Sequence, residues 1–523
     1  MERGGHSTPI NRLYDSEPLM PHKPPDPTAP PQSSPQSYRQ PLATIDLKPG
    51  AHIHLMGICG TAMASLAGLL KSRGFKISGS DQNVYPPMST QLEKLGISIQ
   101  QGYKKENLTP PPDLVIVGNV ISTKYEEAQA LLESDIPFTS LPRAMGELVI
   151  EKRHSIVVAG THGKTTTTSM NAFIAEDLGL KPGFMIGGIP KNFDLSFRSP
   201  SGDYFVIEGD EYDTAFFDKV PKFIHYRPQS VILNSVEFDH ADIYRDLEHV
   251  KQSFLLLLDL IPDGGVLVAC EDEESIRDLL ERRRASLTKR KVKVVTFGLE
   301  RGDYQARDVK VVPGRGLEFS VTRKNKLHDT LVHLNLMGRY NVKNALASIA
   351  LWETLGFPTE GVVRSLAAFS GVKRRQDILG TPNGITVIED FAHHPTAVKE
   401  TIRTVQEQFP QNTVFSIFEA RSATSRRNVF QEEYADAFSS AQRVLFPPVF
   451  NPTGIAEAER FSMEKLLRDL RSKNVKVDLM DGVDAIVARV VAEARPGDAV
   501  LVMSNGGFDG IYQKLLTRLE AGK

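Results

Sequence analysis

Short apolar runs alternate with amphipathic stretches along the chain from His52 onward, and this alternation predicts strands followed by helices. In the first unit the run at 52–57 is a predicted strand, and the stretch at 61–74 is a predicted helix that ends at Gly74. Three more apolar runs predict strands here: KISGSD, ISIQQGY and DLVIVGNVIS. Strands that alternate with helices indicate a parallel sheet with helices on both faces.

Two further units repeat this alternation. The second opens at HSIVVAG and continues through DYFVIEGDE and SVILNSVEFDH to a predicted helix in GRYNVKNALASIALWETLG. Within it, LEFSVTRKNKLHDTLVHLNLMG alternates apolar and polar residues and predicts an antiparallel hairpin added to the sheet. The third unit has five predicted strands: GITVIEDFAH, TVFSIFEA, RVLFPPVF, VKVDLMD and DAVLVMSNGG. The predicted fold class is α/β, with three consecutive domains at 47–152, 153–370 and 371–523.

The composition argues against several classes of protein. A chain of 523 residues is too long for one compact core, and a prior of roughly 150 residues per domain agrees with three. A formal charge of -2 gives no electrostatic case for nucleic acid or an anionic membrane as a partner. Two distant cysteines, Cys59 and Cys270, argue against a disulfide framework. We therefore expect a protein of the reducing cytoplasm, and we also expect it to be a monomer.

The first 46 residues differ from the rest of the chain. They are rich in Pro, Ser and Gln and poor in branched apolar residues, so they cannot bury enough surface to offset the entropy of ordering. They also lack the apolar core of a secretory signal. The sequence predicts a disordered tail, and the alternative is a proline-type docking ligand.

The segment GTHGKTTTT at 160–168 directly follows the apolar run SIVVA and is a predicted phosphate loop. It is two residues shorter than the usual G-x-x-x-x-G-K-[ST] loop. Gly160 and Gly163 would let the backbone approach phosphates, Lys164 can reach the terminal phosphates, and the Thr165 hydroxyl can bind magnesium. The amides at the helix start would face the anion. The alternative is a plain strand-turn-helix junction with threonines as caps.

Two of the predicted strands that follow end in acidic residues. FVIEGDEYDTAFF carries Glu208, Asp210 and Glu211, and LNSVEFDHADIY carries Glu237 and His240. Carboxylates at the carboxyl end of a strand beside a phosphate loop are where a divalent ion is held, whereas acids in isolation more often form a solvated loop. Their position beside the loop favours a metal site.

Together these motifs resemble the Mur ligase family, ATP-dependent enzymes that form amide bonds in peptidoglycan synthesis. The loop of that family is the short G-T-x-G-K-[ST], which GTHGKTT matches. The resemblance covers nearly the whole chain from His52 and implies a Rossmann-like UDP-sugar domain, a central P-loop ATPase domain and a Rossmann-like C-terminal domain. It is carried by the following segments: HLMGICGTAMASLAGLL, GSDQNVYPPMS, EGDEYDTAFFDK, FDHADIY, GRYNVKNAL, KRRQ, DFAHHPTA and MSNGGFDGI.

The resemblance implies a reaction in two steps. The carboxylate of UDP-N-acetylmuramate attacks the γ-phosphate of ATP, and an amine then displaces phosphate from the acyl phosphate. Because two anions meet in the first step, cations must shield them. Lys164 and Mg²⁺ held by Thr165 and Glu208 would supply this shielding, His240 would hold a second Mg²⁺, and Arg375 of KRR would approach the ATP phosphates. The alternative for His240 is a structural role.

The resemblance also implies the contacts to the nucleotide. Asn341 and Asn344 match the adenine-contacting segment, with Tyr340 where the family more often has histidine, and Asp390 matches a segment that faces the nucleotide. The implied contacts of the phosphate loop are Gly160, Thr161, His162, Gly163, Lys164, Thr165 and Thr166.

The segment GICGTAM is the predicted site for the pyrophosphate of the UDP-sugar. It departs from G-x-G-x-x-G at Cys59 and Ala62, but it stands between a strand and a helix, which suits a pyrophosphate. Asp81 ends the next strand, where a Rossmann fold binds a ribose or base. Cys59 is interpreted as a packing residue and not a nucleophile. The predicted contacts are Gly57, Ile58, Cys59, Gly60, Thr61, Ala62, Ser80 and Asp81.

Several segments, among them YPPMST, EYDTAFFDK and VMSNGGF, are most similar to those family members that ligate the whole tripeptide L-alanyl-γ-D-glutamyl-meso-diaminopimelate. Arg421, Thr424 and Arg426 end a predicted strand, and arginine forks suit the carboxylates of such a peptide. His394 is a further predicted substrate contact, although it could simply cap a helix. Two other functions stay open: ligation of L-alanine alone, and a non-catalytic ATP-binding regulator.

Overall fold

The protein is described by a computed structural model that covers residues 44–84, 88–241, 243–312, 315–324 and 329–522. The predicted tail at 1–46 lies outside the described residues except for its last three. No helix in the described ranges is both long and apolar enough to cross a lipid bilayer.

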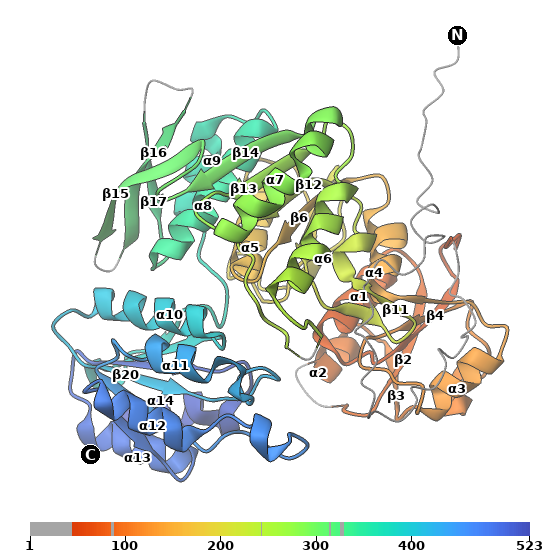
Figure 1. The fold of residues 1–523 in the computed structure, drawn as a ribbon. Coiled ribbons are helices and arrows are strands. Elements are labelled where there is room, and N and C mark those ends of the chain that lie inside the picture. The colour runs from red at the N-terminus through yellow and green to blue at the C-terminus, as the bar shows by residue number, and fades with distance from the viewer. Residues whose placement is uncertain (1–43, 85–87, 242, 313–314, 325–328, 523) are drawn as a thin grey trace, which may run out of the picture. The chain divides into compact units, whose positions relative to one another are not determined.

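The first sheet has five parallel strands in the order β3-β2-β1-β4-β5 (Figure 1). Helix α1 forms because its alanines and leucines favour helix, and its residues 63–70 are all buried. The chain leaves it at Gly74, whose φ of 88° suits glycine. The strands are β1 His52–Met56, β2 Lys76–Asp81, β3 Ser98–Gln101, β4 Leu114–Val117 and β5 Phe138–Ser140. The helices are α1 Thr61–Ser72, α2 Met88–Lys94, η2 Lys105–Leu108, α3 Glu126–Glu133, α4 Leu141–Ala144 and η3 Met145–Ile150.

The second sheet has ten strands in the order β17-β16-β15-β14-β13-β12-β6-β9-β7-β8, and a separate hairpin pairs β10 with β11. Its centre is parallel, and β6 lies between β12 and β9, so the phosphate loop after β6 is flanked by both acidic strand ends. The strands are β6 His154–Ala159, β7 Gly183–Met185, β8 Phe197–Arg198, β9 Tyr204–Gly209, β10 Asp213–Ala215, β11 Asp218–Pro221, β12 Pro228–Leu233, β13 Val266–Cys270, β14 Lys293–Gly298, β15 Tyr304–Val312, β16 Gly316–Arg323 and β17 Thr330–Leu334. The helices are α5 Lys164–Asp177, η4 Lys222–His225, α6 Leu247–Leu260, α7 Glu274–Lys289, α8 Arg339–Thr354 and α9 Thr359–Ala368.

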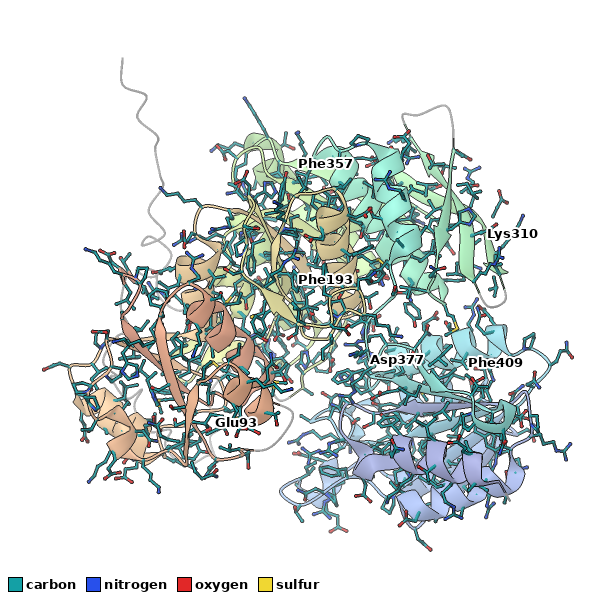
Figure 2. The ribbon with its side chains drawn as sticks, turned by 180° about the vertical axis from the view of Figure 1, so that it is seen from behind. Glu93, Phe193, Lys310, Phe357, Asp377 and Phe409 are labelled. Carbon is teal, nitrogen blue, oxygen red and sulfur yellow. The ribbon has the colours of Figure 1, made fainter. Side chains whose placement is uncertain are left out.

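Both edges of this sheet are antiparallel, at β15–β16–β17 and at β7–β8. Strands β16 and β17 pair antiparallel, as the alternation of apolar and polar residues predicts, and β16 alternates buried and half-buried positions along its length. Figure 2 shows Lys310 of β15 pointing away from the sheet. Phe193, also labelled there, is half-buried and packs against the core of this domain. Phe193 packs on Phe184 with ring centroids 4.7 Å apart.

The third sheet has six strands in the order β18-β19-β23-β20-β21-β22, all parallel except the β18–β19 pair. Two apolar clusters fill its two faces. The strands are β18 Asp377–Gly380, β19 Thr386–Asp390, β20 Val414–Phe418, β21 Arg443–Phe446, β22 Lys476–Leu479 and β23 Ala499–Met503. The helices are η5 Pro382–Gly384, α10 Pro395–Gln408, η6 Asn428–Phe430, α11 Gln431–Ala437, η7 Glu457–Glu459, α12 Met463–Ser472, α13 Val483–Glu493, η8 Phe508–Gly510 and α14 Ile511–Ala521.

The predicted α/β fold class with three consecutive domains is thus confirmed, with one mainly parallel sheet in each. The limits predicted for the domains remain a proposal. They fall between elements, after η3 and after α9, and so cut no strand or helix.

Candidate active site

Both glycines of the phosphate loop are required by the backbone. Gly160 has φ 129°, and a Cβ there would lie 2.7 Å from the Ser235 carbonyl oxygen. Gly163 has φ 80°, and a Cβ there would lie 2.8 Å from the Asn344 side-chain oxygen. Gly163 is also the N-cap of α5, and no side chain caps that helix. The first amides of α5 are therefore available to an anion.

The loop is fastened to the chain that follows β12. Thr161 donates its amide to the Ser235 carbonyl at 3.0 Å, and the His162 amide donates to the Ser235 hydroxyl at 2.9 Å. The Glu237 amide donates to the Thr161 hydroxyl at 2.9 Å. These bonds fasten the loop to the segment after β12, and such support is what a preorganised phosphate site requires.

Lys164 is held by the loop and by Glu211. Its Nζ donates to the Gly160 carbonyl at 2.6 Å and lies 2.9 Å from Glu211 Oε2, whose side chain is only 3% exposed. Burial alone would lower the pKa of Lys164, but the carboxylates of Glu211 and Asp210 outweigh it and raise the pKa above its ordinary value. Lys164 therefore stays cationic at the mouth of the loop.

His240 contacts the same carboxylate. Its Nε2 lies 3.4 Å from Glu211 Oε1, and its backbone has φ 56°, which is unusual for a residue other than glycine. Burial lowers the pKa of His240, whereas the hydrogen bond to Glu211 and the Asp239 carboxylate raise it, and the net direction is upward. Glu211 thus joins Lys164 to His240. The sequence places Glu211 among the acids of this strand end but gives no reason to choose it over Glu208.

Thr165, Glu208 and Arg375 meet on the other side of the loop. The Thr165 hydroxyl donates to Glu208 Oε2 at 3.2 Å, and Arg375 Nη2 donates to the same hydroxyl at 3.3 Å. Burial raises the pKa of Glu208 despite the Gly187 amide and the Arg375 charge, which act in the opposite direction. A buried hydroxyl beside a half-buried carboxylate supplies two oxygen donors of the kind that a hard divalent cation prefers. The structure does not join His240 to this pair, so its role as a ligand of a second Mg²⁺ stays a prediction.

The predicted adenine contacts lie on α8. Asn344 Nδ2 donates to Asn341 Oδ1 at 3.0 Å, and Asn341 Nδ2 donates to the Met337 carbonyl at 2.7 Å. Asp390 ends β19, and its two oxygens accept from the backbone amides of Ala392 at 2.7 Å and of Gln376 at 2.8 Å. Asp390 therefore fixes the segment that carries Arg375, and burial raises its pKa.

The structure shows the surroundings of His394 and of Tyr340. His394 is the N-cap of α10 and accepts from the Thr396 amide at 3.3 Å, which is the capping alternative that the sequence left open. Tyr340 is half-buried beside Asp390 and Arg375, and its desolvation raises its pKa well above the usual range. A substrate contact by His394 stays a prediction.

The glycine turn after β1 is fixed by Asp81. Its Oδ2 accepts from the Cys59 amide and its Oδ1 from the Asn83 amide, each at 2.9 Å. The Gly57 amide donates to the Ser80 carbonyl at 2.8 Å. Helix α1 begins without a side-chain cap at the exposed end of this turn, which suits a pyrophosphate. In this arrangement Asp81 shapes the turn, and its contact with a ribose or base stays a prediction.

Asp81→Ala is expected to weaken UDP-N-acetylmuramate binding and to leave ATP binding unchanged. The substitution leaves the Cys59 and Asn83 amides without their acceptor, and losing such a bond costs about 1–3 kcal/mol, or roughly 5- to 150-fold in affinity. Calorimetric titration with each ligand measures the effect, and the exposed Asp135→Ala is the control. A larger loss for ATP than for the UDP-sugar would contradict this placement.

The Cys59 thiol is expected to react slowly with iodoacetamide. Burial, followed by the Asp81 carboxylate, raises the pKa of Cys59 to about 11. At pH 8 only about one thiol in a thousand is then the reactive thiolate. Mass spectrometry of labelled peptides should show a rate that rises about tenfold per pH unit from 8 to 10. Fast labelling at pH 7 that does not depend on pH would contradict the packing interpretation.

The residues predicted to bind the peptide follow β20. Arg421 lies over the Phe450 ring with its Cζ 3.9 Å from the centroid, and Arg426 Nη1 donates to the Asn451 carbonyl at 2.9 Å. Thr424 donates to Asp239 Oδ1 at 3.3 Å and so contacts the acidic segment after β12. Their assignment to a peptide stays a prediction.

One cavity of about 1990 Å³ brings together part of these features, and of the predicted UDP-sugar contacts, all of which lie in the described ranges, only Thr61 and Ala62 line it. It is large enough for a nucleotide together with a second substrate. Among the described residues, those that line it do not include Arg421, Thr424 or Arg426. Its lining does include residues from the start of α1, from the phosphate loop, from the acidic strand ends and from the start of the third domain: Thr61, Lys164, Glu208, His240, Asn344 and Arg375.

Comparison with known proteins matches family models to three segments between residues 52 and 506. Residues 52–153 match the catalytic domain of the Mur ligase family, residues 158–352 the Mur ligase middle domain, and residues 374–506 the glutamate ligase domain of Mur ligases. Together these three matches cover the three sheets of the structure.

The chain is 38% identical over 469 residues to the UDP-N-acetylmuramate–L-alanyl-γ-D-glutamyl-meso-2,6-diaminoheptanedioate ligase of Escherichia coli K12. This match covers 89% of this chain and 98% of that protein. It is 32% identical over 454 residues to the UDP-N-acetylmuramate–L-alanine ligase of Clostridium tetani, over 87% of this chain and 95% of that protein. The crystal structure of a murein peptide ligase from Psychrobacter arcticus superposes with a TM-score of 0.66 and 35% identity, over 90% of this chain and 99% of that one. The chain belongs to the Mur ligase family.

Proposed function

We propose that this chain ligates L-alanyl-γ-D-glutamyl-meso-diaminopimelate to the carboxylate of UDP-N-acetylmuramate at the expense of ATP. The observation that carries the proposal is the 38% identity to the Escherichia coli ligase of that specificity, which extends over 98% of its length. The site supports the same chemistry, since one cavity is lined by the start of α1, the phosphate loop and the acidic strand ends.

The first step requires the substrate carboxylate to approach the γ-phosphate. Lys164 is held cationic at the phosphate loop by Glu211, so its ammonium group can offset the charge that gathers there. The amides at the start of α5 add fixed positive dipoles. When bound at Thr165 and Glu208, Mg²⁺ supplies further charge neutralisation for phosphoryl transfer.

Arg375 provides a cation from the segment between the second and third sheets. It reaches the Thr165 hydroxyl, and Asp390 fixes the segment that carries it through the Gln376 amide. Because Arg375 lies on this connecting segment, a movement of the third domain would also move its positive charge relative to the phosphates. In the second step the amine attacks the acyl phosphate, and phosphate leaves as the amide forms.

A second candidate is ligation of L-alanine alone, which is favoured by the 32% identity to the Clostridium tetani enzyme over 95% of its length. Both ligases would carry out the same two steps and differ only in the amine. A non-catalytic ATP-binding role is the remaining alternative. The reactants proposed are soluble small molecules, and a monomeric, cytoplasmic protein remains part of the proposal.

Phosphate release measures the proposed reaction. With Mg²⁺, ATP and UDP-N-acetylmuramate present, we expect phosphate to accumulate only when the tripeptide is added, with one amide product per phosphate. Equal phosphate release with and without the peptide would contradict ligase function. Binding of ATP without any release under either condition would favour the non-catalytic role.

A further inference from the structure

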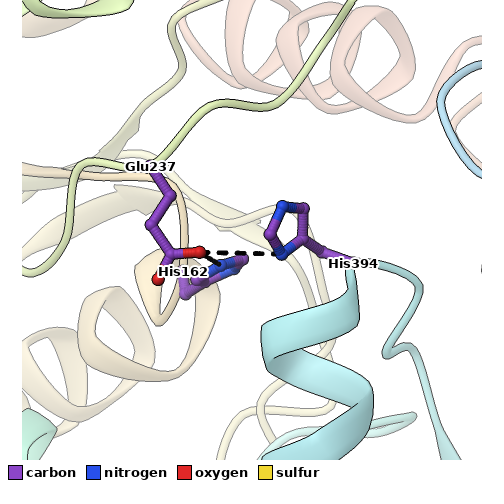
Figure 3. A group of neighbouring side chains, drawn as sticks. All are labelled: His162, Glu237 and His394. Carbon is purple, nitrogen blue, oxygen red and sulfur yellow. Dashed lines mark hydrogen bonds and ion pairs between the residues drawn. The ribbon is translucent and has the colours of Figure 1, made fainter. Parts of the chain in front are cut away.

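Three side chains from distant parts of the sequence converge beside the phosphate loop (Figure 3). His162 belongs to the loop, Glu237 to the segment after β12, and His394 to the start of α10. His162 Nε2 lies 3.3 Å and His394 Nδ1 lies 3.7 Å from the same oxygen, Glu237 Oε2. One nitrogen or oxygen atom from each of the three residues lies within 4.8 Å of the other two.

These separations suit a shared cation. Ligands at about 2.0–2.1 Å from a tetrahedral zinc ion lie about 3.3 Å from one another, so small movements would bring all three atoms to bonding distance. Two imidazoles and one carboxylate form a donor set that prefers Zn²⁺, Co²⁺ or Ni²⁺ to Mg²⁺. All three residues line the large cavity, which gives an ion a path to them.

The surrounding contacts orient the donors. His394 Nε2 lies 3.2 Å from the Phe238 carbonyl, and a proton donated there leaves the lone pair on Nδ1, which faces Glu237. A backbone carbonyl on the second ring nitrogen is the usual arrangement around a metal-binding histidine. The Thr396 hydroxyl donates to Glu237 Oε2 at 2.7 Å and fixes the carboxylate. The Thr396 amide reaches His394 Nδ1 only at 3.3 Å, a long bond that a metal could replace.

We propose that His162, Glu237 and His394 bind one divalent transition-metal ion of the zinc class, separate from the Mg²⁺ held by Thr165 and Glu208. The ion would fasten the phosphate loop and the segment after β12 to the start of α10. It would therefore tie the second domain to the third at the edge of the nucleotide cavity. This inference does not depend on the proposed ligase function, because the site needs no substrate.

Cobalt titration of the full-length, tag-free protein tests the proposal. In the presence of excess Mg²⁺, we expect one equivalent of Co²⁺ to give the intense visible absorption of a four- or five-coordinate ion, and Zn²⁺ to abolish it. Glu237→Gln and His394→Asn should each weaken Co²⁺ binding by at least about tenfold. Tenfold is the lower end of the loss in affinity when a residue that only supports a metal ligand is replaced, and removing a ligand itself should cost no less. Asparagine is a good N-cap, so His394→Asn removes the imidazole and keeps a cap on α10.

His333→Ala is the matched control, because His333 pairs with Glu318 at 3.1 Å on the surface and contributes nothing to the cluster. It should bind Co²⁺ like the parent, and all variants should keep the parent's metal-free melting temperature to within a few degrees. Lack of the absorption band in the parent would overturn the proposal. Unchanged affinity in a folded His394→Asn or Glu237→Gln variant would overturn it as well.

Discussion

Lys164→Ala is expected to reduce kcat for phosphate release by about 10²–10³-fold, the usual loss when one charge-stabilising donor is removed from a transition state. Lys164 is the cation that the phosphate loop and Glu211 together hold in place. Steady-state phosphate release under saturating ATP and both substrates measures the effect. The fold should persist, because Glu211 keeps His240 as a partner.

Lys310→Ala is the control for this substitution, since Lys310 is exposed on β15 (Figure 2). It should leave kcat and the melting temperature at parental values. Near-parental turnover in Lys164→Ala would mean that the loop holds the nucleotide without contributing to the chemistry. A collapse of the melting temperature in parallel with kcat would instead assign Lys164 a structural role.

Glu208→Gln is expected to raise the Mg²⁺ concentration needed for half-maximal activity by at least about tenfold and to lower kcat at saturating Mg²⁺. The amide oxygen of glutamine can still accept from the Gly187 amide, and its NH2 group can donate to the Thr165 hydroxyl, so the local backbone should keep its position. The substitution removes the negative charge and one of the two oxygens that could bind a cation. Activity measured across a Mg²⁺ titration separates the two effects.

Glu93→Gln is the matched control for this change, because Glu93 is exposed on α2 and lines no part of the cavity. Its Mg²⁺ dependence should equal that of the parent. If Glu208→Gln shows the same Mg²⁺ dependence as Glu93→Gln, the Thr165–Glu208 pair is not the metal site.

The order of strands and helices follows from local sequence, which explains why it could be predicted. The run HIHLMG became β1 and the alternating stretch after Gly316 became the β16–β17 hairpin, since both depend on periodicity within one element. The β10–β11 hairpin was missed because its strands are short and their register shifts between Asp213 and Ala215. Short strands with an irregular register show no alternation of apolar and polar residues from which a strand could be predicted.

The site was predicted less completely, because partners of polar groups are set by tertiary packing. The loop follows from motif spacing, and its Thr165–Glu208 pair was implied by the family resemblance. The pairing of Lys164 with Glu211 does not, since Glu208 and Glu211 stand at the same strand end and only the fold separates them. The approach of His394 to Glu237 joins residues from two domains, and no local pattern encodes it.

The identity of the amine is the central claim, and competing substrates test it most directly. A tripeptide offers several carboxylates, and each charge-assisted contact contributes about 1.5–3 kcal/mol, so two such contacts correspond to a preference of roughly 10²–10⁴-fold. The measurement is kcat/KM for L-alanyl-γ-D-glutamyl-meso-diaminopimelate and for L-alanine, with Mg²⁺, ATP and UDP-N-acetylmuramate held constant and the products identified by mass spectrometry. We predict a preference for the tripeptide in that range, whereas comparable values or a preference for L-alanine would contradict the proposed function.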